Sequence, residues 1–119
     1  MQNNNLYSYT KAKVESLTKN LLVIKRDGRV VKFDAEKIYN AIEKAVHSVF
    51  GKNHSVNING IVDNVILEIA NRFKENIKIY ELQNIVEHTL LTLGEEAIYE
   101  EYVGYRSMRD IERERSLDI

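Results

Sequence analysis

The chain contains no cysteine and no proline. Without cysteine there are no disulfides, no thiolate nucleophile and none of the usual cysteine-based structural zinc sites. The lack of proline suits a chain of helices with short connections, because proline disrupts helix interiors. No apolar run approaches the length of a membrane span, and the polar start lacks the hydrophobic segment of a signal peptide. We therefore expect a cytoplasmic protein with no membrane partner.

An excess of charge of one sign is also missing, since 17 basic residues stand against 18 acidic ones. The field of the whole chain therefore gives no reason to expect direct binding to nucleic acid, and any phosphate binding must come from a local cluster. A length of 119 residues suits one domain with one core. Residues 1–20 are predicted to form a polar leader, poorly ordered or loosely helical, ahead of a domain over residues 21–119.

No catalytic arrangement emerges from the sequence. It has no Gly-rich P-loop, no G-x-S-x-G elbow, no H-E-x-x-H motif and no carboxylate pair that can be placed in a shared cleft. The histidines His47, His54 and His88 are scattered, and none has a second histidine at metal-ligand spacing, so no metal ligand is assigned. We expect a chain without catalytic residues of its own.

A β-hairpin is predicted around Asp27-Gly28, with strands over residues 21–25 and 29–33, because this dipeptide between β-branched runs is a strong hairpin signal. Pairing the strands about this turn predicts a core-facing side with Leu22, Ile24, Val31 and Phe33. The opposite face is then mixed and would suit an apolar base beside its phosphates; it holds Val23, Lys25, Val30 and Lys32.

Four helices follow from apolar residues at i, i+3, i+4 spacing. The first runs from Ala35 to Gly51, and the second covers residues 58–73. The third carries its inward residues from Leu82 to Leu93 and ends at Gly94. The last begins near Glu95, with Ile98, Tyr102, Tyr105 and Met108 facing inward. Lys78, between Ile77 and Ile79, allows a short third strand as an alternative to a loop. The predicted fold class is α+β, mainly α: a lid of two or three strands, built on a hairpin, packed on a four-helix bundle.

Cations gather where the hairpin runs into the first helix: Lys25, Arg26, Arg29 and Lys32 on the hairpin and Lys37 in the first helical turn. Asp34 stands at the N-cap position. Lysine on a strand is often only edge protection, and that explanation would carry about half the weight for an isolated hairpin. Here the helix N-terminus adds N–H groups that favour an anion, which points to a triphosphate between hairpin and helix.

A second cationic stripe lies on the last helix, where Arg106, Arg109 and Arg113 are spaced i, i+3, i+7. The alternative is that these arginines pair with nearby acids such as Glu101, Asp110 and Glu112.

Other polar residues leave alternatives open. The tyrosines Tyr99, Tyr102 and Tyr105 are interpreted as core residues with their hydroxyls at the rim, rather than as a platform for bases. Gln83 and Asn84 could cap the third helix or read the edge of a base.

Three motifs together resemble the ATP-cone, the small allosteric domain at the front of many ribonucleotide reductases. The first runs from Val23 through Lys25-Arg26-Asp27-Gly28 to Phe33-Asp34 and Lys37-Ile38. The second is residues 82–87, Leu-Gln-Asn-Ile-Val-Glu, with Asn84 where the family usually has aspartate. The third is Tyr102 with Tyr105-Arg106 and Arg109. The likeness covers roughly residues 21–110, and the ending resembles most the anaerobic, glycyl-radical ribonucleoside-triphosphate reductases.

The resemblance implies ATP or dATP, accompanied by Mg²⁺, bound between hairpin and helices as an allosteric effector. It further implies regulation of the catalytic domain of a parent reductase, usually through a nucleotide-dependent homo-oligomer. Lys25, Arg26 and Lys37 would contact phosphates, with help from Arg106 or Arg109. Val23 and Asp34 would lie near the adenine, and Gln83 near base or phosphate.

Two alternatives stand beside this expectation. A repressor of reductase genes also carries an ATP-cone, but that family normally has a four-cysteine zinc ribbon, and this sequence has no cysteine. A helical protein-interaction module without a ligand is the other alternative, in which the basic hairpin is only surface.

Overall fold

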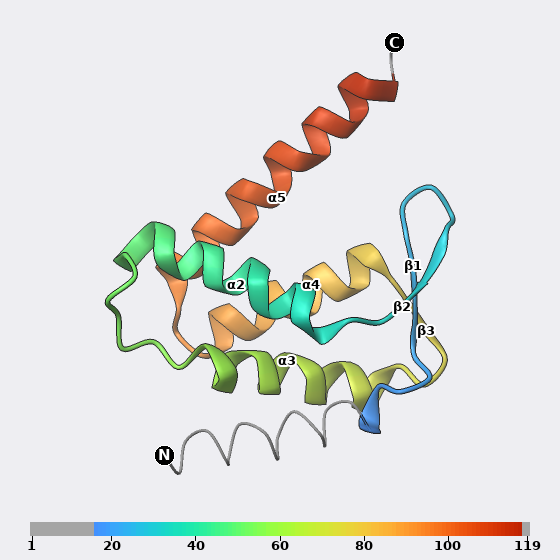
Figure 1. Cartoon of the computed structure of the whole chain (residues 1–119), viewed down its shortest axis with the longest axis horizontal. Coiled ribbons are helices and arrows are strands. Elements are labelled where there is room, and N and C mark those ends of the chain that lie inside the picture. Colours follow the sequence, from blue (N-terminus) through green and yellow to red (C-terminus); the bar gives the residue numbers. More distant parts are fainter. Residues whose placement is uncertain (1–15, 118–119) are drawn as a thin grey trace.

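The structure, a computed structural model, describes residues 16–117, apart from the side chains of residue 110 and residues 113–117. The predicted leader over residues 1–20 therefore lies largely outside the described residues. The elements in chain order are β1 (Leu22–Ile24), β2 (Val30–Lys32), α2 (Ala35–Phe50), α3 (Ile58–Arg72), β3 (Asn76–Lys78), α4 (Ile79–Thr92) and α5 (Glu96–Leu117). The mainly α, α+β class is confirmed, with four helices and a three-stranded mixed sheet in the described chain (Figure 1).

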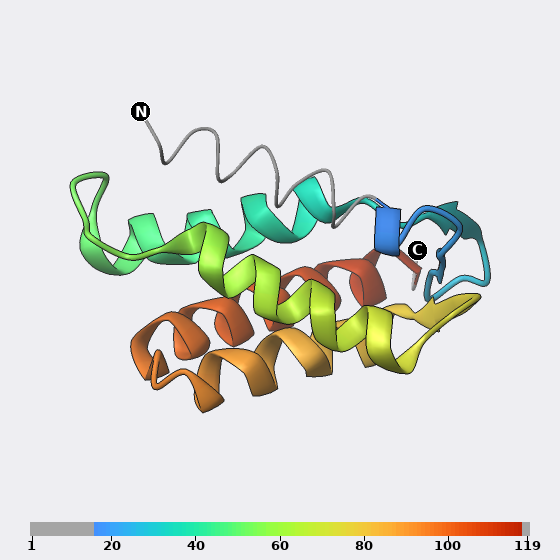
Figure 2. The ribbon, with the colours of Figure 1, turned by 90° about the horizontal axis from the view of Figure 1, so that it is seen from below.

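The four helices form a bundle with the small sheet at one end, and α5 extends beyond the bundle (Figures 1 and 2). Each helix packs against two others, in the cyclic order α2, α3, α4, α5. The largest fully buried side chains come from all four helices and from β3: Ile42, Ile66, Ile69, Ile77, Leu90 and Ile98. Each such side chain contributes about 1.5 to 3 kcal/mol when it leaves water, so the core fixes the bundle that carries the sheet.

Helix α2 begins where the sequence predicted. The Asp34 side chain accepts a hydrogen bond from the Glu36 N–H at 3.0 Å, which satisfies one of the free donors of the first turn. Gly51 ends the helix with a φ of 79°, a conformation that favours glycine. Because only Phe33 and Asp34 separate β2 from α2, the first turn of this helix lies directly beside the hairpin.

Strand β1 is the centre of the sheet, whose order is β2-β1-β3. It pairs antiparallel with β2 and parallel with β3, so Val23 stands opposite both Val31 and Ile77. The third strand is thus confirmed at Asn76–Lys78, while Ile79 already belongs to α4. A carboxylate oxygen of Glu81 accepts a hydrogen bond from the Lys78 N–H at 3.0 Å, at the start of that helix.

The predicted hairpin register is wrong by one residue. The Lys25 N–H donates to the Arg29 carbonyl at 2.8 Å and the Gly28 N–H to the Lys25 carbonyl at 3.0 Å, so the loop holds three residues with Gly28 at φ 90°. This geometry matches a three-residue loop that ends in a left-handed glycine. A slip of one residue exchanges the two faces of a strand.

The slip has a direct consequence for burial. Val23 is buried and Leu22 is 39% exposed, which is the reverse of the predicted inward face. Val23 now shares its side of the sheet with Val31 rather than with Val30.

Three helix residues predicted to face inward are also exposed. Leu93 follows the last residue of α4, where the chain turns at Gly94, so it leaves the apolar stripe of that helix. Tyr105 and Met108 lie further along α5, which extends past the bundle (Figure 1). Tyr105 contacts α2 through Lys44, but both side chains remain exposed because few elements cover this part of the helix. Ile98 and Tyr102, nearer the start of α5, are buried as predicted.

Within residues 16–117, the structure contains no helix that is both long enough and apolar enough to cross a membrane.

Candidate functional site

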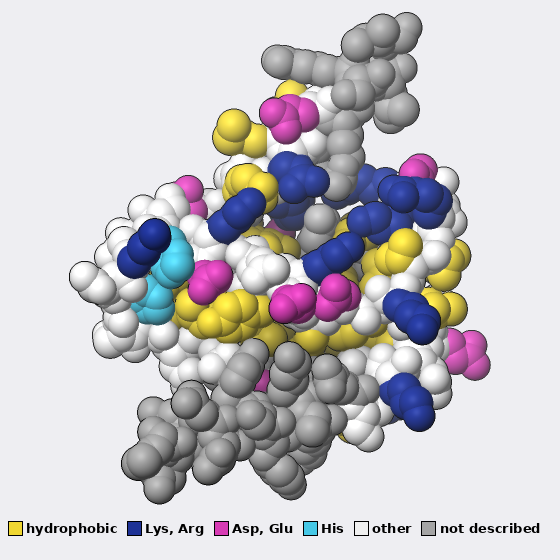
Figure 3. Space-filling model, viewed as in Figure 1, with side chains coloured by type: hydrophobic (Ala, Val, Ile, Leu, Met, Phe, Trp, Pro, Cys, Tyr) yellow, Lys and Arg dark blue, Asp and Glu magenta, His cyan; other side chains and the backbone are white. Residues whose placement is uncertain are grey.

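A cavity of 170 Å³ lies where the hairpin, α2, α4 and α5 meet. Strands β1 and β2 and the short connection to α2 contribute to its walls, because the hairpin folds over the first turn of that helix. The space-filling view shows lysine and arginine side chains around the hollow between the hairpin and α5 (Figure 3). The residues of one continuous stretch, 23–41, thus form one wall, and those of α4 and α5 form the other.

One part of the lining is apolar. These side chains come from the inner side of the hairpin, from α2 and from α4: Val23, Val31, Phe33, Ile38, Ala41, Ile79, Leu82 and Val86. Several also belong to the core cluster or pack against it, so they are held in place by the same contacts that stabilise the bundle. A preformed apolar wall of this kind suits a flat, weakly polar group such as an aromatic ring.

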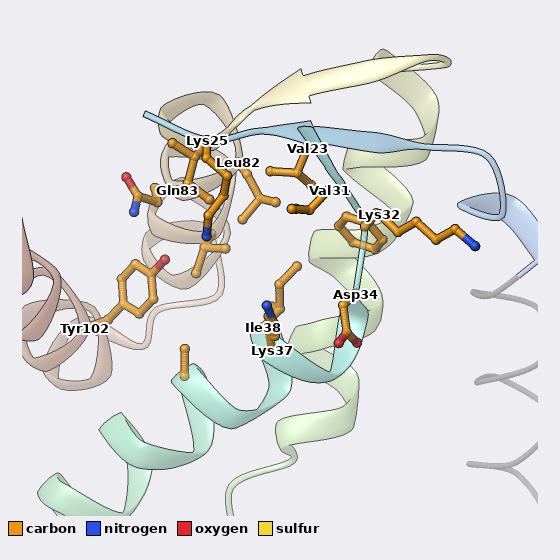
Figure 4. Close-up of a pocket in the computed structure, with 14 residues that line it drawn as sticks. Val23, Lys25, Val31, Lys32, Asp34, Lys37, Ile38, Leu82, Gln83 and Tyr102 are labelled. Atoms are coloured by element: carbon orange, nitrogen blue, oxygen red, sulfur yellow. The ribbon is translucent and has the colours of Figure 1, made fainter. Parts of the chain in front are cut away.

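The polar part of the lining holds Lys25, Lys32, Asp34, Lys37, Gln83 and Tyr102. In the close-up, the ends of Lys25 and Tyr102 point toward one another, Gln83 lies beside them, and Lys37 is on α2 across the pocket (Figure 4). Lys32 extends away from this group (Figure 4). The cavity therefore has an apolar region next to a group of cationic and hydrogen-bonding side chains.

The hairpin loop is tied to α4 across this site. A guanidinium nitrogen of Arg26 donates a hydrogen bond to the side-chain oxygen of Gln83 at 3.2 Å. Within the loop, the Arg29 guanidinium lies 2.7 Å from a carboxylate oxygen of Asp27. Hydrogen bonds from the Arg29 backbone and side chain keep the pKa of Asp27 below its usual range. Arg29 is therefore neutralised inside the loop, whereas Arg26 reaches toward the pocket wall.

The α5 side of the site contains a half-buried ion pair. Arg106 of α5 pairs with Glu87 of α4, and their side chains are 24% and 16% exposed. Tyr102 lies one turn earlier on α5 and is 9% exposed. Its burial, together with the negative charge of Glu87, raises the pKa of Tyr102 to about 12, although Arg106 acts in the opposite direction. The Tyr102 hydroxyl therefore stays protonated at neutral pH.

A smaller group of polar residues borders the site on the outside. The Tyr105 hydroxyl accepts hydrogen bonds from Lys44 at 3.3 Å and from Arg109 at 3.4 Å. Both cations also lie over the Tyr105 ring, at 5.1 Å and 5.9 Å from its centroid. The hydrogen bond from Arg109, and then that from Lys44, lowers the pKa of Tyr105 below its usual value. This group edges a second cavity, which shares Ala41 and Tyr102 with the first.

Metal-ligating side chains do not gather anywhere in the described part of the chain, where no group of three histidine, cysteine or acidic residues could hold a metal ion. The rings of His47 and His54 lie 5.5 Å apart, but the Nδ1 of His54 accepts a hydrogen bond from the Val56 N–H. Asp34, which lines the pocket, accepts the capping hydrogen bond of α2.

The structure brings most of the predicted site residues to one place. Val23, Lys25, Asp34, Lys37 and Gln83 line the same cavity, and Arg26 contacts it through Gln83. Gln83 lies in the second turn of α4, so it does not cap that helix.

Two predicted residues lie elsewhere. Arg106 and Arg109 are not among the lining residues, and Arg106 pairs with Glu87 of α4. Sequence reasoning missed Tyr102 as a lining residue. Its place in the motif with Tyr105-Arg106 and Arg109 could have identified it, but its helical spacing favoured a core position.

The whole of this site falls inside a segment that matches a known family. Residues 21–111 match the ATP cone domain family. This chain belongs to the ATP-cone family. The matched segment begins at β1 and ends within α5, so it contains all of the pocket-lining residues.

Individual relatives agree with this membership. The chain is 35% identical over 96 residues to an anaerobic ribonucleoside-triphosphate reductase of Haemophilus influenzae, which covers 81% of the chain and 13% of that protein. It is 28% identical over 116 residues to a ribonucleoside-diphosphate reductase subunit alpha of Chlamydia pneumoniae, covering 89% of the chain and 11% of the subunit.

A third relative is the transcriptional repressor NrdR of Caldicellulosiruptor bescii, 35% identical over 94 residues, covering 76% of the chain and 58% of the repressor. The chain thus spans only about an eighth of the reductases it matches.

Proposed function

We propose that this ATP-cone binds ATP or dATP in the pocket between the hairpin and helices α2 and α4, as an allosteric effector of a ribonucleotide reductase. The observation that carries the proposal is the arrangement of the lining: an apolar region from Val23, Ile38 and Leu82 beside the amino groups of Lys25 and Lys37. The apolar region suits an adenine ring, and the amino groups suit a triphosphate. Family membership supports the same ligand class.

The division of the pocket suggests how the nucleotide would lie. The cavity of 170 Å³ is smaller than the roughly 300 to 1,000 Å³ of typical ligand pockets, so it would enclose only part of a nucleotide. The adenine would occupy the apolar region near Val23, with Asp34 within reach of its edge. The phosphates would lie against Lys25 and Lys37 at the rim, where Arg26 and Gln83 would also contact them. The part of Arg106 and Arg109 in ligand binding stays a prediction.

Magnesium would be bound mainly by the nucleotide. Mg²⁺ in nucleotide sites is commonly held by phosphate oxygens, water and one or two carboxylates. Asp34 is the carboxylate of the pocket lining, and it already accepts a hydrogen bond at the start of α2. The described residues therefore fit a Mg²⁺ ion carried on the triphosphate, and not a separate protein site for the metal.

Regulation of a reductase would require a partner beyond this domain. The relatives include an anaerobic ribonucleoside-triphosphate reductase, of which the chain spans 13%. We propose that the partner is the catalytic domain of such an enzyme, and that the bound nucleotide changes how copies of the enzyme assemble. The activity and the assembly belong to the whole enzyme, whereas nucleotide binding is a property of the domain alone.

Titration calorimetry with Mg·ATP and Mg·dATP tests the ligand directly. We expect one or both nucleotides to bind with heat that saturates below millimolar concentration. Absence of binding at millimolar nucleotide would contradict the proposal and favour an interaction module without a ligand. Adding nucleotide should also raise the thermal midpoint of the domain, because a ligand that binds only the folded state stabilises it.

Two lysine variants test which residues hold the phosphates. Lys25→Ala and Lys37→Ala should each weaken ATP binding by at least about tenfold, since a hydrogen bond to a charged group is worth about 1.5 to 3 kcal/mol. The thermal midpoint of the unliganded variants should stay nearly unchanged. Lys52→Ala, at an exposed loop position outside the pocket lining, is the matched control and should bind like the original chain. A variant that unfolds instead would show that the lysine is structural.

A further inference from the structure

The hydroxyl of Tyr102 is a polar group of the pocket wall with no assigned task. The ring belongs to the core cluster, and the residue is 9% exposed. The same residue lines the pocket, and its hydroxyl points toward the end of Lys25 (Figure 4). No hydrogen bond to this hydroxyl is found within the part of the chain that the structure describes. The Tyr102 oxygen is not among the fully buried side-chain atoms that lack a partner, so it is open to the cavity and can donate to a bound ligand.

The partner that suits this hydroxyl is an anionic acceptor. The hydroxyl is neutral at physiological pH, since burial and Glu87 raise the pKa of Tyr102. A neutral O–H group can donate, and its bond to an anionic oxygen is about twice as strong as one between neutral groups. Lys25 and Lys37 make this side of the pocket favourable for such an anion.

We propose that the Tyr102 hydroxyl donates a hydrogen bond to a phosphate oxygen of the bound nucleotide, next to Lys25. This inference rests on the proposed function, because it requires a nucleotide in the pocket. It adds a ligand-contacting residue on α5, whereas the other lining residues belong to the hairpin, its connection to α2, α2 itself or α4.

The position of Tyr102 gives the contact a structural consequence. Tyr102 lies one turn before Arg106, which pairs with Glu87 of α4, and α5 then extends past the bundle (Figure 1). A phosphate bound by Tyr102 would therefore link the hairpin wall to the helix that extends past the bundle. In this arrangement the phosphates of the nucleotide, rather than its base, act on α5.

Tyr102→Phe is the direct test, because it removes one oxygen and keeps the ring. We expect its dissociation constant for ATP to rise about tenfold or more, and that for tripolyphosphate to rise similarly. The affinity for adenosine and the thermal midpoint should not change. Tyr99→Phe is the matched control, since Tyr99 is half-buried on the same helix and does not line the pocket. It should leave all four measurements unchanged.

Three results would overturn the inference. An unchanged ATP affinity in Tyr102→Phe, with normal binding by the original chain, would show that the hydroxyl does not touch the ligand. An equal loss for adenosine would place the contact on the nucleoside. If the original chain binds no ATP at all, the proposed function itself fails, so the two failures are distinguishable.

A measurement on the original chain keeps the inference testable if the variant does not fold. The Cζ resonance of Tyr102 in a ¹³C-labelled sample reports hydrogen bonding of its hydroxyl. Tripolyphosphate and ATP should both shift this resonance, and adenosine should not. A resonance that is unmoved by saturating ATP would contradict the contact.

Discussion

The cations on the two sides of the pocket differ in their position relative to the cavity. On the side of the hairpin and α2, Lys25 and Lys37 line the cavity itself. On the side of α5, Arg106 pairs with Glu87, and Arg109 donates to the Tyr105 hydroxyl. The two groups carry the same charge, but the lysines line the cavity, whereas the arginines lie outside its lining and bind protein acceptors. Cations beside a pocket can therefore stabilise the fold, and their position near the pocket does not by itself make them ligand-binding residues.

The energetic difference between these sides follows from burial. Exposed ion pairs contribute about 0 to 1 kcal/mol, because water screens them and two long side chains must be ordered. The Glu87 and Arg106 side chains are only 16% and 24% exposed, so their attraction is screened less. Removing one partner would also leave the other charge partly buried, which is costly.

Among the substitutions that test this difference, Arg106→Ala should have the largest effect. We expect it to lower the free energy of unfolding by about 3 kcal/mol, measured by urea denaturation, because Glu87 loses its partner. Arg72→Ala is the matched control. Its pair with Glu68 has side chains 56% and 49% exposed, so the loss should be about 0.5 kcal/mol or less. If Arg106→Ala instead abolishes ATP binding and leaves the unfolding curve unchanged, Arg106 belongs with the ligand cations.

Tyr102 lies between the two groups of cations, and its raised pKa predicts a loss of stability at high pH. Its pKa is about 12 in the folded protein against an ordinary value of 10.0, so above about pH 10 the unfolded chain releases this proton first. The contribution of the Tyr102 hydroxyl to the free energy of unfolding is fully present below pH 10. It falls by up to about 2.7 kcal/mol as the pH rises toward 12. The measurement is the urea midpoint near pH 8 and near pH 11. Tyr102→Phe should lose less stability over this interval than the original chain; an equal loss would place Tyr102 in a solvated environment.

The helices could be predicted from the sequence because their signals are local. The i, i+4 series Ile38, Ile42 and Val46 is buried, and Asp34 and Gly51 mark the two ends of α2. The same reasoning was wrong for Leu93 and Tyr105. Periodicity says which residues share a face of a helix, but not where the neighbouring helices stop.

The hairpin shows the opposite limit. Asp27-Gly28 correctly indicated a turn, yet the loop has three residues instead of two, and this exchanged the predicted faces. Val23 and Lys25 still line the pocket together, because residues two apart along an extended chain share a face in either register. The pairing of Arg106 with Glu87 joins residues of two helices, and no spacing rule within one helix reports it.

The smallest expected effect concerns the outer group around Tyr105, and it tests whether the α5 cations differ among themselves. Arg109 donates the hydrogen bond that most lowers the pKa of Tyr105, but Tyr105 is 41% exposed. Arg109→Ala should therefore raise the pKa of Tyr105 toward its ordinary value, measured by the absorbance of tyrosinate. The thermal midpoint should move by less than about 2 °C, because exposed contacts of this kind contribute little. A large fall of the midpoint would show that Arg109, like Arg106, holds α5 to the bundle, and the division between the two arginines would be lost.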